Sequence, residues 1–199
     1  MNKTFQPGLQ IGLLAAMLTL STAAFAHPGH ETMMGFASGL SHPFFGLDHL
    51  VAMIALGFVA VKLHARRLTF ASFSTGMVLG GILAAMDIAI PYVEAIIVAS
   101  LLAIAYTLFN RTAGSARPVY AVPAIVIFAA GHGWAHVAEQ PVELSSAGYM
   151  AGMMLGAICL QAIGLMLSQR LRQKVAAERA VAGTSLVAAV MAATSLLLG

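Results

Sequence analysis

Residues 42–61 read HPFFGLDHLVAMIALGFVAV. Two histidines and an aspartate open the stretch, and an almost unbroken apolar run follows from Leu50 to Val61. A helix crosses the hydrocarbon of a bilayer with about 20 predominantly apolar residues. The stretch therefore predicts a membrane-spanning helix whose first turns carry ionisable side chains. Such side chains are costly there unless they are paired, hydrated or bound to an ion.

The whole chain of 199 residues shares this apolar character. Apolar types make up 60% of it and charged residues 9%. A soluble domain has about 45–50% apolar residues and about 25% charged residues. So few charges cannot cover a water-facing surface, which excludes a soluble globular protein, a disordered tail and a nucleic-acid binder. The expected partner is the lipid bilayer, and the formal net charge of +3 is typical of the orientation signal of a membrane protein.

The N-terminal 26 residues are typical of a secretory signal peptide. Lys3 gives a positive start, Leu9–Leu20 is a short apolar segment, and residues 24–26 (AFA) fit the small-x-small cleavage pattern. We expect cleavage after residue 26, which leaves a single transmembrane domain over residues 27–199. An uncleaved first helix is the alternative.

Six apolar segments follow, and each is near the length that a membrane span needs. They fill most of residues 27–199 and leave short loops. The predicted fold is therefore all-α: one polytopic membrane bundle of six transmembrane helices. The predicted spans are Gly46–Val61, Leu68–Met86, Pro91–Phe109, Tyr120–Val137, Ser145–Leu167 and Ala180–Leu198.

Basic residues set the expected orientation. After residue 26, every Lys and Arg falls in alternate loops, between spans one and two, three and four, and five and six. Loops rich in basic residues stay in the cytoplasm, so both ends of the mature chain are expected outside. The predicted location is the bacterial inner (cytoplasmic) membrane, with a periplasmic N-terminus. Six of the seven histidines then lie on the outer side, and His64 is the exception.

Two spans carry glycines four residues apart: Gly76 with Gly80, and Gly148 with Gly152 and Gly156. This spacing lets helix backbones approach closely. We expect these faces to pack inside the bundle, and a seam between two copies in a homo-oligomer is the alternative.

The first polar cluster lies at the outer end of the first span and contains His42, Asp48 and His49. Pro43 and Gly46 are expected to interrupt regular helix there. Irregular backbone at membrane depth is tolerated only against protein or a wet cavity. The preceding polar, glycine-containing segment predicts a short re-entrant or interfacial piece that folds His42 back over the other two side chains.

The second polar cluster, near the outer end of the fourth span, contains His132, His136 and Glu139. Their spacing of four and then three residues places them on one face of a helix. Two imidazoles at this spacing can bind one metal ion, as in the HExxH motif. Gly133 replaces the glutamate of that motif, so a metalloprotease would lack its general base.

Each cluster offers imidazole and carboxylate at a similar depth, so together they predict one site for a divalent cation. Imidazole suits nickel, cobalt, zinc and copper, whereas magnesium and calcium prefer oxygen ligands. A hydrogen-bonded network that only ties helices together is the alternative.

Two further groups of side chains could assist such a site. Asp87 and Glu94 flank the outer turn between the second and third spans, where an acidic vestibule would raise the local cation concentration; ordinary solvated turn residues are the alternative. His27 and His30, at the mature N-terminus, are predicted to capture metal, and a floppy terminus is the alternative.

The two clusters also carry a resemblance to a known family. His42-Pro43-x-x-Gly46-x-Asp48-His49 and His132-Gly133-x-Ala135-His136-x-x-Glu139 resemble motifs of the HupE/UreJ family of bacterial membrane proteins, and the likeness covers essentially the whole chain. The resemblance implies a nickel permease that supplies hydrogenase or urease assembly, with cobalt or other metals handled by some members. It also implies that the metal pathway is carried by His42, Asp48, His49, His132, His136 and Glu139.

We therefore expect a secondary transporter, not an enzyme, that imports Ni²⁺, or Co²⁺, from periplasm to cytoplasm. The chain has no P-loop sequence for ATP, and neither a catalytic residue nor a resident cofactor is expected. One alternative is an intramembrane zinc hydrolase that holds zinc with His132, His136 and a third histidine and uses Asp48 as base. The other is a membrane metal sensor or chaperone that binds the ion without moving it.

Overall fold

The structure of the protein is a computed structural model that describes residues 35–110, 118–139, 146–171 and 175–198. Every regular element in these ranges is helical, which confirms the all-α prediction. The predicted signal peptide, residues 1–26, lies outside the described residues, as do His27 and His30.

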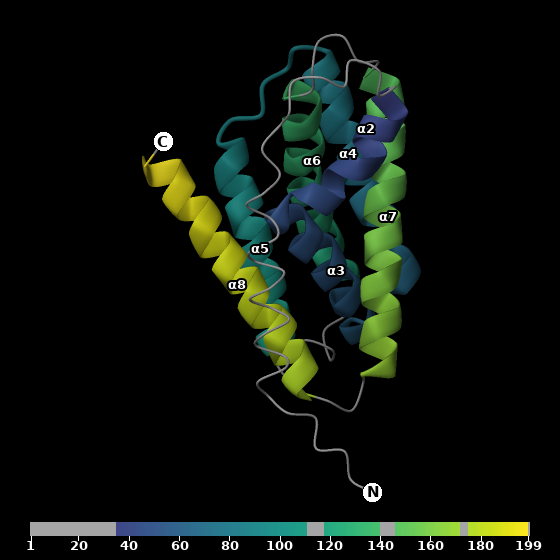
Figure 1. Ribbon diagram of the computed structural model, residues 1–199, viewed down its shortest axis with the longest axis vertical. Helices are drawn as coiled ribbons and strands as arrows, with labels where there is room; N and C mark the ends of the chain where they lie inside the picture. Colours follow the sequence, from purple (N-terminus) through teal and green to yellow (C-terminus); the bar gives the residue numbers. More distant parts are fainter. Residues whose placement is uncertain (1–34, 111–117, 140–145, 172–174, 199) are drawn as a thin grey trace, which may run out of the picture.

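Each predicted span corresponds to a helix, with ends that differ by a few residues. In chain order the elements are α2 (Gly35–Phe45), α3 (Leu47–Lys62), α4 (Arg66–Ala85), α5 (Val93–Phe109), the 3-10 turn η3 (Pro118–Ala121), α6 (Val122–Ala138), α7 (Ser146–Arg170) and α8 (Val175–Leu198). Helices α4 to α7 run roughly along the long axis of the molecule, whereas α8 is tilted against this axis and α2 crosses it obliquely (Figure 1).

The helices have the length and composition of a multi-pass membrane protein. Four segments are each long and apolar enough to cross a bilayer: α4, α7, α8, and α6 together with the preceding residues of η3, Val119–Ala138. Helices α2 and α3, bent by 77° against each other, make a fifth candidate when they are taken as one broken span. Helix α5 is apolar but has only 17 residues. The predicted first span therefore corresponds to α3, the second helix of this bent pair.

The break between α2 and α3 falls at Gly46, whose backbone is extended (φ −90°, ψ 120°). Pro43, which was also expected to interrupt the helix, instead lies inside α2 and is buried. Proline lacks the N–H that would bond to the carbonyl four residues earlier. The loss is limited to one bond, to the carbonyl of Gly39, and α2 ends two residues after Pro43, at Phe45.

Helix α3 is the centre of the bundle. Its buried side chains, among them Ala52, Leu56 and Phe58, point in all directions around the helix, and it packs against α2, α4, α5, α7 and α8. A helix that is apolar all round must be covered on every side. The outer helices in turn expose large apolar residues such as Val78, Ile127 and Val187, which suits a surface that faces lipid.

Glycines allow the closest helix contacts, as the spacing predicted. A methyl group at Gly80 on α4 would overlap the backbone of Ala130 on α6. Similarly, a methyl group at Gly152 on α7 would overlap the backbone of Phe36 on α2. Both glycine faces are therefore used inside the bundle, between α4 and α6 and between α2 and α7.

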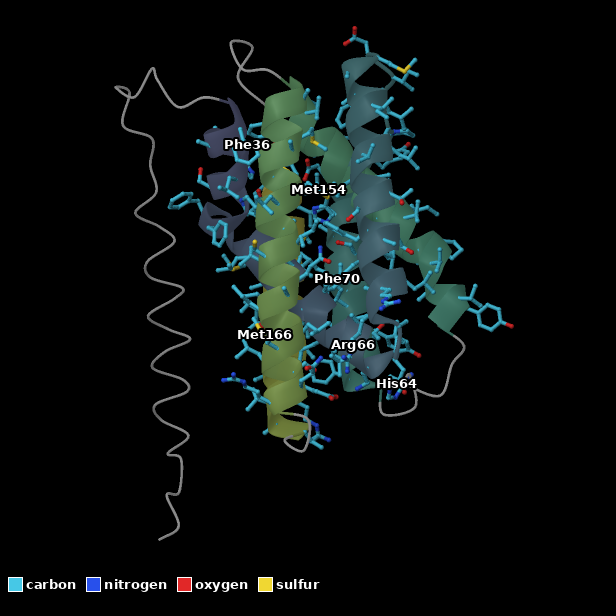
Figure 2. All side chains as sticks on the ribbon, turned by 90° about the vertical axis from the view of Figure 1, so that its right-hand side faces the viewer. Phe36, His64, Arg66, Phe70, Met154 and Met166 are labelled. Carbon is cyan, nitrogen blue, oxygen red and sulfur yellow. The ribbon has the colours of Figure 1, made fainter. Side chains whose placement is uncertain are left out.

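The two ends of the bundle differ in charge. One end, here called the basic end, carries Arg66 and His64, opposite the end where Phe36 lies (Figure 2). There Lys62 Nζ lies 2.8 Å from Glu178 Oε2 and donates a hydrogen bond of 2.8 Å to the carbonyl of Leu108, which ties α3, α5 and α8 together.

The opposite end, here called the acidic end, carries Glu94 in the first turn of α5 and Glu139 at the C-terminus of α6. Trp134 Nε1 of α6 donates a hydrogen bond of 2.8 Å to the carbonyl of Ile88. This contact anchors the turn between α4 and α5 to α6, just ahead of Glu94.

Substitution of Gly80 by alanine tests the close packing of α4 and α6. Alanine normally favours a helix over glycine by about 1 kcal/mol, but the overlap with Ala130 should cost about 1–3 kcal/mol. We expect a thermal unfolding midpoint in detergent that is lower by roughly 2–4 °C for each net kcal/mol lost. Gly183→Ala is the matched control, because nothing lies within 4 Å of the added methyl group. A midpoint for Gly80→Ala as high as that of Gly183→Ala would contradict this packing.

Candidate metal centre

The bend at Gly46 brings the histidines of the first cluster together. His42 lies near the end of α2 and His49 in the first turn of α3. Their ring centroids are 5.6 Å apart and the rings are nearly perpendicular. The expected fold-back of His42 over His49 is therefore present, and it is produced by the sharp angle between the two helices.

Helix α6 supplies the other two imidazoles. His132 and His136 are both buried, with 3% of their surface exposed. The ring of His136 lies 4.8 Å from that of His42 and 4.3 Å from that of His49, measured between centroids. Since His132 is also 5.6 Å from His49, four imidazoles from three helices face one space.

Three of these imidazoles form a candidate metal site. His42, His49 and His136 each offer a ring nitrogen, and these atoms lie within 4.8 Å of one another. Metal–nitrogen bonds of about 2.0–2.1 Å place tetrahedral donors about 3.4 Å apart, so the ring nitrogens need to approach one another by at most about 1.4 Å around an ion. The Nδ1 atom of His136 is buried and makes no hydrogen bond to any described residue, as expected for a group that awaits an ion or water.

Two hydroxyl groups hold the imidazoles from behind. The hydroxyl of Tyr149 on α7 lies 2.9 Å from Nδ1 of His42, and Oγ of Ser100 on α5 lies 3.1 Å from Nε2 of His132. A metal-binding histidine usually donates its second ring N–H to such a partner, which fixes the ring. Of the two supported rings, only His42 belongs to the three-imidazole group. When His42 binds through Nε2, its Nδ1–H can donate to the oxygen of Tyr149.

A cavity of about 500 Å³ leads from the acidic end to the imidazoles. His49 and His136 line it on one side, and Glu94 and Glu139 lie at its walls. The rest of the lining is mostly apolar and comes largely from α8. Two carboxylates beside a low-dielectric opening attract cations, so the cavity has the character of an entrance.

Among the described residues, three of the predicted ligands, His42, His49 and His136, form one group. Glu139 is exposed and lines the cavity together with His49 and His136. Glu94, expected as a vestibule residue, lines the same cavity, whereas Asp87 lies exposed in the turn after α4 and is not part of that lining. Asp48 belongs to the first turn of α3, but its side chain lies outside the described part of the chain, like His27 and His30.

Comparison with known proteins identifies the family of the chain. The family model described as HupE / UreJ protein matches residues 15–196. The chain belongs to the HupE/UreJ family. It is 36% identical to Protein HupE of Rhizobium leguminosarum bv. viciae over 156 residues, which cover 75% of this chain and 78% of that relative. No solved structure matches the chain.

Sequence reasoning did not find Tyr149 or Ser100. Tyr149 lies 107 residues from His42, and Ser100 lies 32 residues from His132. Neither belongs to a HupE/UreJ motif quoted above. An isolated hydroxyl in an apolar span gives no signal of its own, because serine and tyrosine also serve there as ordinary contacts between helices.

Removal of the Tyr149 hydroxyl tests its role behind the candidate site. We expect Tyr149→Phe to weaken Ni²⁺ and Co²⁺ binding by about 10–100-fold, as is usual when the hydrogen-bond partner of a metal-binding histidine is lost. Titration of the purified protein with either ion measures this. Tyr120→Phe, an exposed tyrosine in η3, serves as the control. Equal metal affinity in wild type and Tyr149→Phe would show that the Tyr149 hydroxyl does not support metal binding.

Proposed function

We propose that this HupE/UreJ protein is a secondary transporter that imports Ni²⁺, with Co²⁺ as a second substrate, from the periplasm to the cytoplasm. The observation that carries the proposal is the group of three imidazoles, His42, His49 and His136, inside an apolar helix bundle. Ionisable side chains in such a place usually mark an ion pathway. The metal would supply hydrogenase or urease assembly, as the family resemblance implies.

The donor atoms favour a late first-row divalent ion. Imidazole nitrogen suits nickel, cobalt, copper and zinc, and affinity alone separates these ions poorly. Magnesium and calcium would want more oxygen ligands than the three-imidazole site offers. The choice of nickel among the imidazole-binding ions rests on membership of the HupE/UreJ family.

The charges at the two ends support the proposed orientation. Lys62, Arg66 and Arg170 lie at the basic end, and the positive-inside rule favours a cytoplasmic position for that end. The 500 Å³ cavity with Glu94 and Glu139 then opens to the periplasm. In this orientation the protein lies in the inner membrane with the N-terminus of α2 on the periplasmic side.

Six crossings fit this orientation best. The pair α2 and α3 makes the first, and α4 to α8 make the others. The 17 residues of α5 span about 25 Å, a few ångströms short of the hydrocarbon thickness. Nevertheless α5 runs from Glu94 at the acidic end to Leu108 at the basic end, where Lys62 bonds its carbonyl.

The geometry indicates how import would begin. The carboxylates of Glu94 and Glu139 concentrate the hydrated cation in the cavity. The imidazoles of His42, His49 and His136 then replace water in the coordination shell of the cation. The three ring nitrogens must move slightly closer together to do so. A membrane potential that is negative inside favours inward movement by about 2.3 kcal/mol per charge per 100 mV.

Two other functions use the same donors. Three histidines with an open position also form the ligand set of hydrolytic zinc sites, so an intramembrane zinc hydrolase is one of them. A sensor or chaperone that binds but does not move the ion is the other.

Uptake of radioactive nickel into proteoliposomes tests transport directly. His136→Asn should lower the uptake rate by at least about ten-fold, because it removes a donor from the three-imidazole site. His64→Asn is the matched control: His64 is exposed at the basic end and has a positive φ (53°), a conformation that asparagine tolerates. We expect this variant to transport like the wild type.

The same preparation separates the three functions. Nickel binding without uptake by the wild type would contradict transport and favour a sensor or chaperone. Zinc-dependent hydrolysis of lipid or peptide, lost in His136→Asn, would favour the hydrolase.

A further inference from the structure

The hydrogen bonds of Ser100 determine which nitrogen of His132 carries the proton. Ser100 Oγ donates a bond of 2.7 Å to the carbonyl of Ile97, and the same oxygen lies 3.1 Å from Nε2 of His132. A hydroxyl has one proton, and here it is used on the carbonyl. The oxygen must therefore accept from Nε2–H, and a neutral His132 then carries its lone pair on Nδ1.

His132 occupies a different place from the other three imidazoles. It lies outside the group of His42, His49 and His136, although its ring centroid is 5.6 Å from that of His49 and 6.5 Å from that of His136. On its other side it borders a second cavity, of about 100 Å³, between α3, α5 and α6. His132 thus separates the candidate metal site from this inner cavity.

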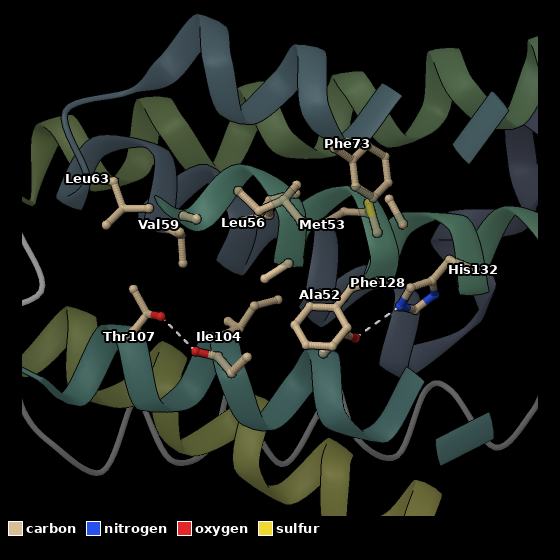
Figure 3. A pocket seen from close by; sticks show the side chains of 16 residues that line it. Ala52, Met53, Leu56, Val59, Leu63, Phe73, Ile104, Thr107, Phe128 and His132 are labelled. Carbon is tan, nitrogen blue, oxygen red and sulfur yellow. Dashed lines mark hydrogen bonds between the residues drawn. The ribbon is translucent and has the colours of Figure 1, made fainter. Parts of the chain in front are cut away.

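The inner cavity extends from His132 toward the basic end. Figure 3 shows His132 at one end of it and Leu63 and Thr107 at the other. Apart from His132, Thr107 and Ser100, its walls are apolar, with Met53, Leu56 and Phe128 among them. Leu63 directly follows Lys62, which bonds the neighbouring carbonyl of Leu108. The cavity therefore covers the depth between the imidazoles and the basic end.

We infer that Ser100 is a positioning residue that holds His132 in its Nε2–H form, so that Nδ1 takes the ion from the three-imidazole site and passes it toward the inner cavity. This inference rests on the proposed transport function. It supplies the inward half of the pathway, for which the sequence shows no ligand set.

The dimensions of the inner cavity suit such a step. A volume of about 100 Å³ holds about three water molecules, which can replace imidazole ligands as the ion leaves His132. Ser100 and Thr107 both line it and are seven residues apart on α5, about 10 Å along one helix face. The hydroxyl of Thr107 donates to the carbonyl of Ala103 at 2.7 Å, so its oxygen lone pairs remain usable by a hydrated ion.

A positioning role predicts a separation between binding and transport. Ser100→Ala removes the acceptor of His132 Nε2–H but none of the three imidazoles that bind first. We expect nickel affinity in detergent to stay unchanged while the uptake rate in proteoliposomes falls by about ten-fold or more. Ser100→Thr keeps a hydroxyl and should restore uptake. Ser185→Ala is the matched control, since this buried serine also donates to a helix carbonyl, of Val181 at 3.0 Å, but is not in either cavity lining.

The tautomer provides a readout that does not depend on transport. In full-length protein with ¹⁵N-labelled histidine, the resonances of His132 are assigned by comparison with His132→Asn. We expect the Nε2–H form in the wild type and in Ser100→Thr, and loss of this preference in Ser100→Ala. An Nδ1–H form in the wild type would overturn the inference.

The outcomes distinguish this inference from the proposed function. Wild-type uptake with an undiminished rate in Ser100→Ala would leave transport intact and refute the role of Ser100. A parallel loss of affinity and uptake in Ser100→Ala would show that Ser100 only supports the three-imidazole site or the fold. Nickel binding without uptake by the wild type would refute transport and with it the inward step.

Discussion

An imidazole inside an apolar helix bundle is costly unless a hydrogen bond, water or an ion satisfies its ring nitrogens. Four such rings meet in this protein, two of them almost fully buried. The surrounding structure is arranged to hold them: the bend at Gly46 turns His42 toward His49, and glycine contacts bring α6 close to α4. Hydroxyls of Tyr149 and Ser100 support two of the rings.

The space on the two sides of the imidazoles is unequal. The cavity at the acidic end is larger, about 500 Å³, and has carboxylates at its walls, whereas the inner cavity is about 100 Å³, mostly apolar and without a carboxylate in its lining. Beyond the inner cavity, the ion pair of Lys62 with Glu178 holds α3 and α8 together. A cation is thus attracted on one side and confined on the other, which describes a site open to the acidic end and narrow toward the basic end.

The local parts of this arrangement could be predicted from the sequence. Apolar runs gave the helices, glycine spacing gave the contact faces, and the i, i+4 spacing placed His132 and His136 on one face of α6. The rest depends on how helices pack. No periodicity encodes the 77° bend, the continuation of α2 through Pro43 or the contact of Tyr149 with His42. The sequence grouped Glu139 with the imidazoles, and its side chain lines the same cavity as His49 and His136.

X-ray absorption spectroscopy of the Ni²⁺-loaded, full-length protein tests the central claim most directly, because it reports the number and type of ligands around the ion. The account predicts about three imidazole nitrogens at roughly 2.0–2.1 Å, and two in His136→Asn. An ion surrounded by oxygen with one imidazole or none, and unaffected by His136→Asn, would contradict a shared site built from α2, α3 and α6.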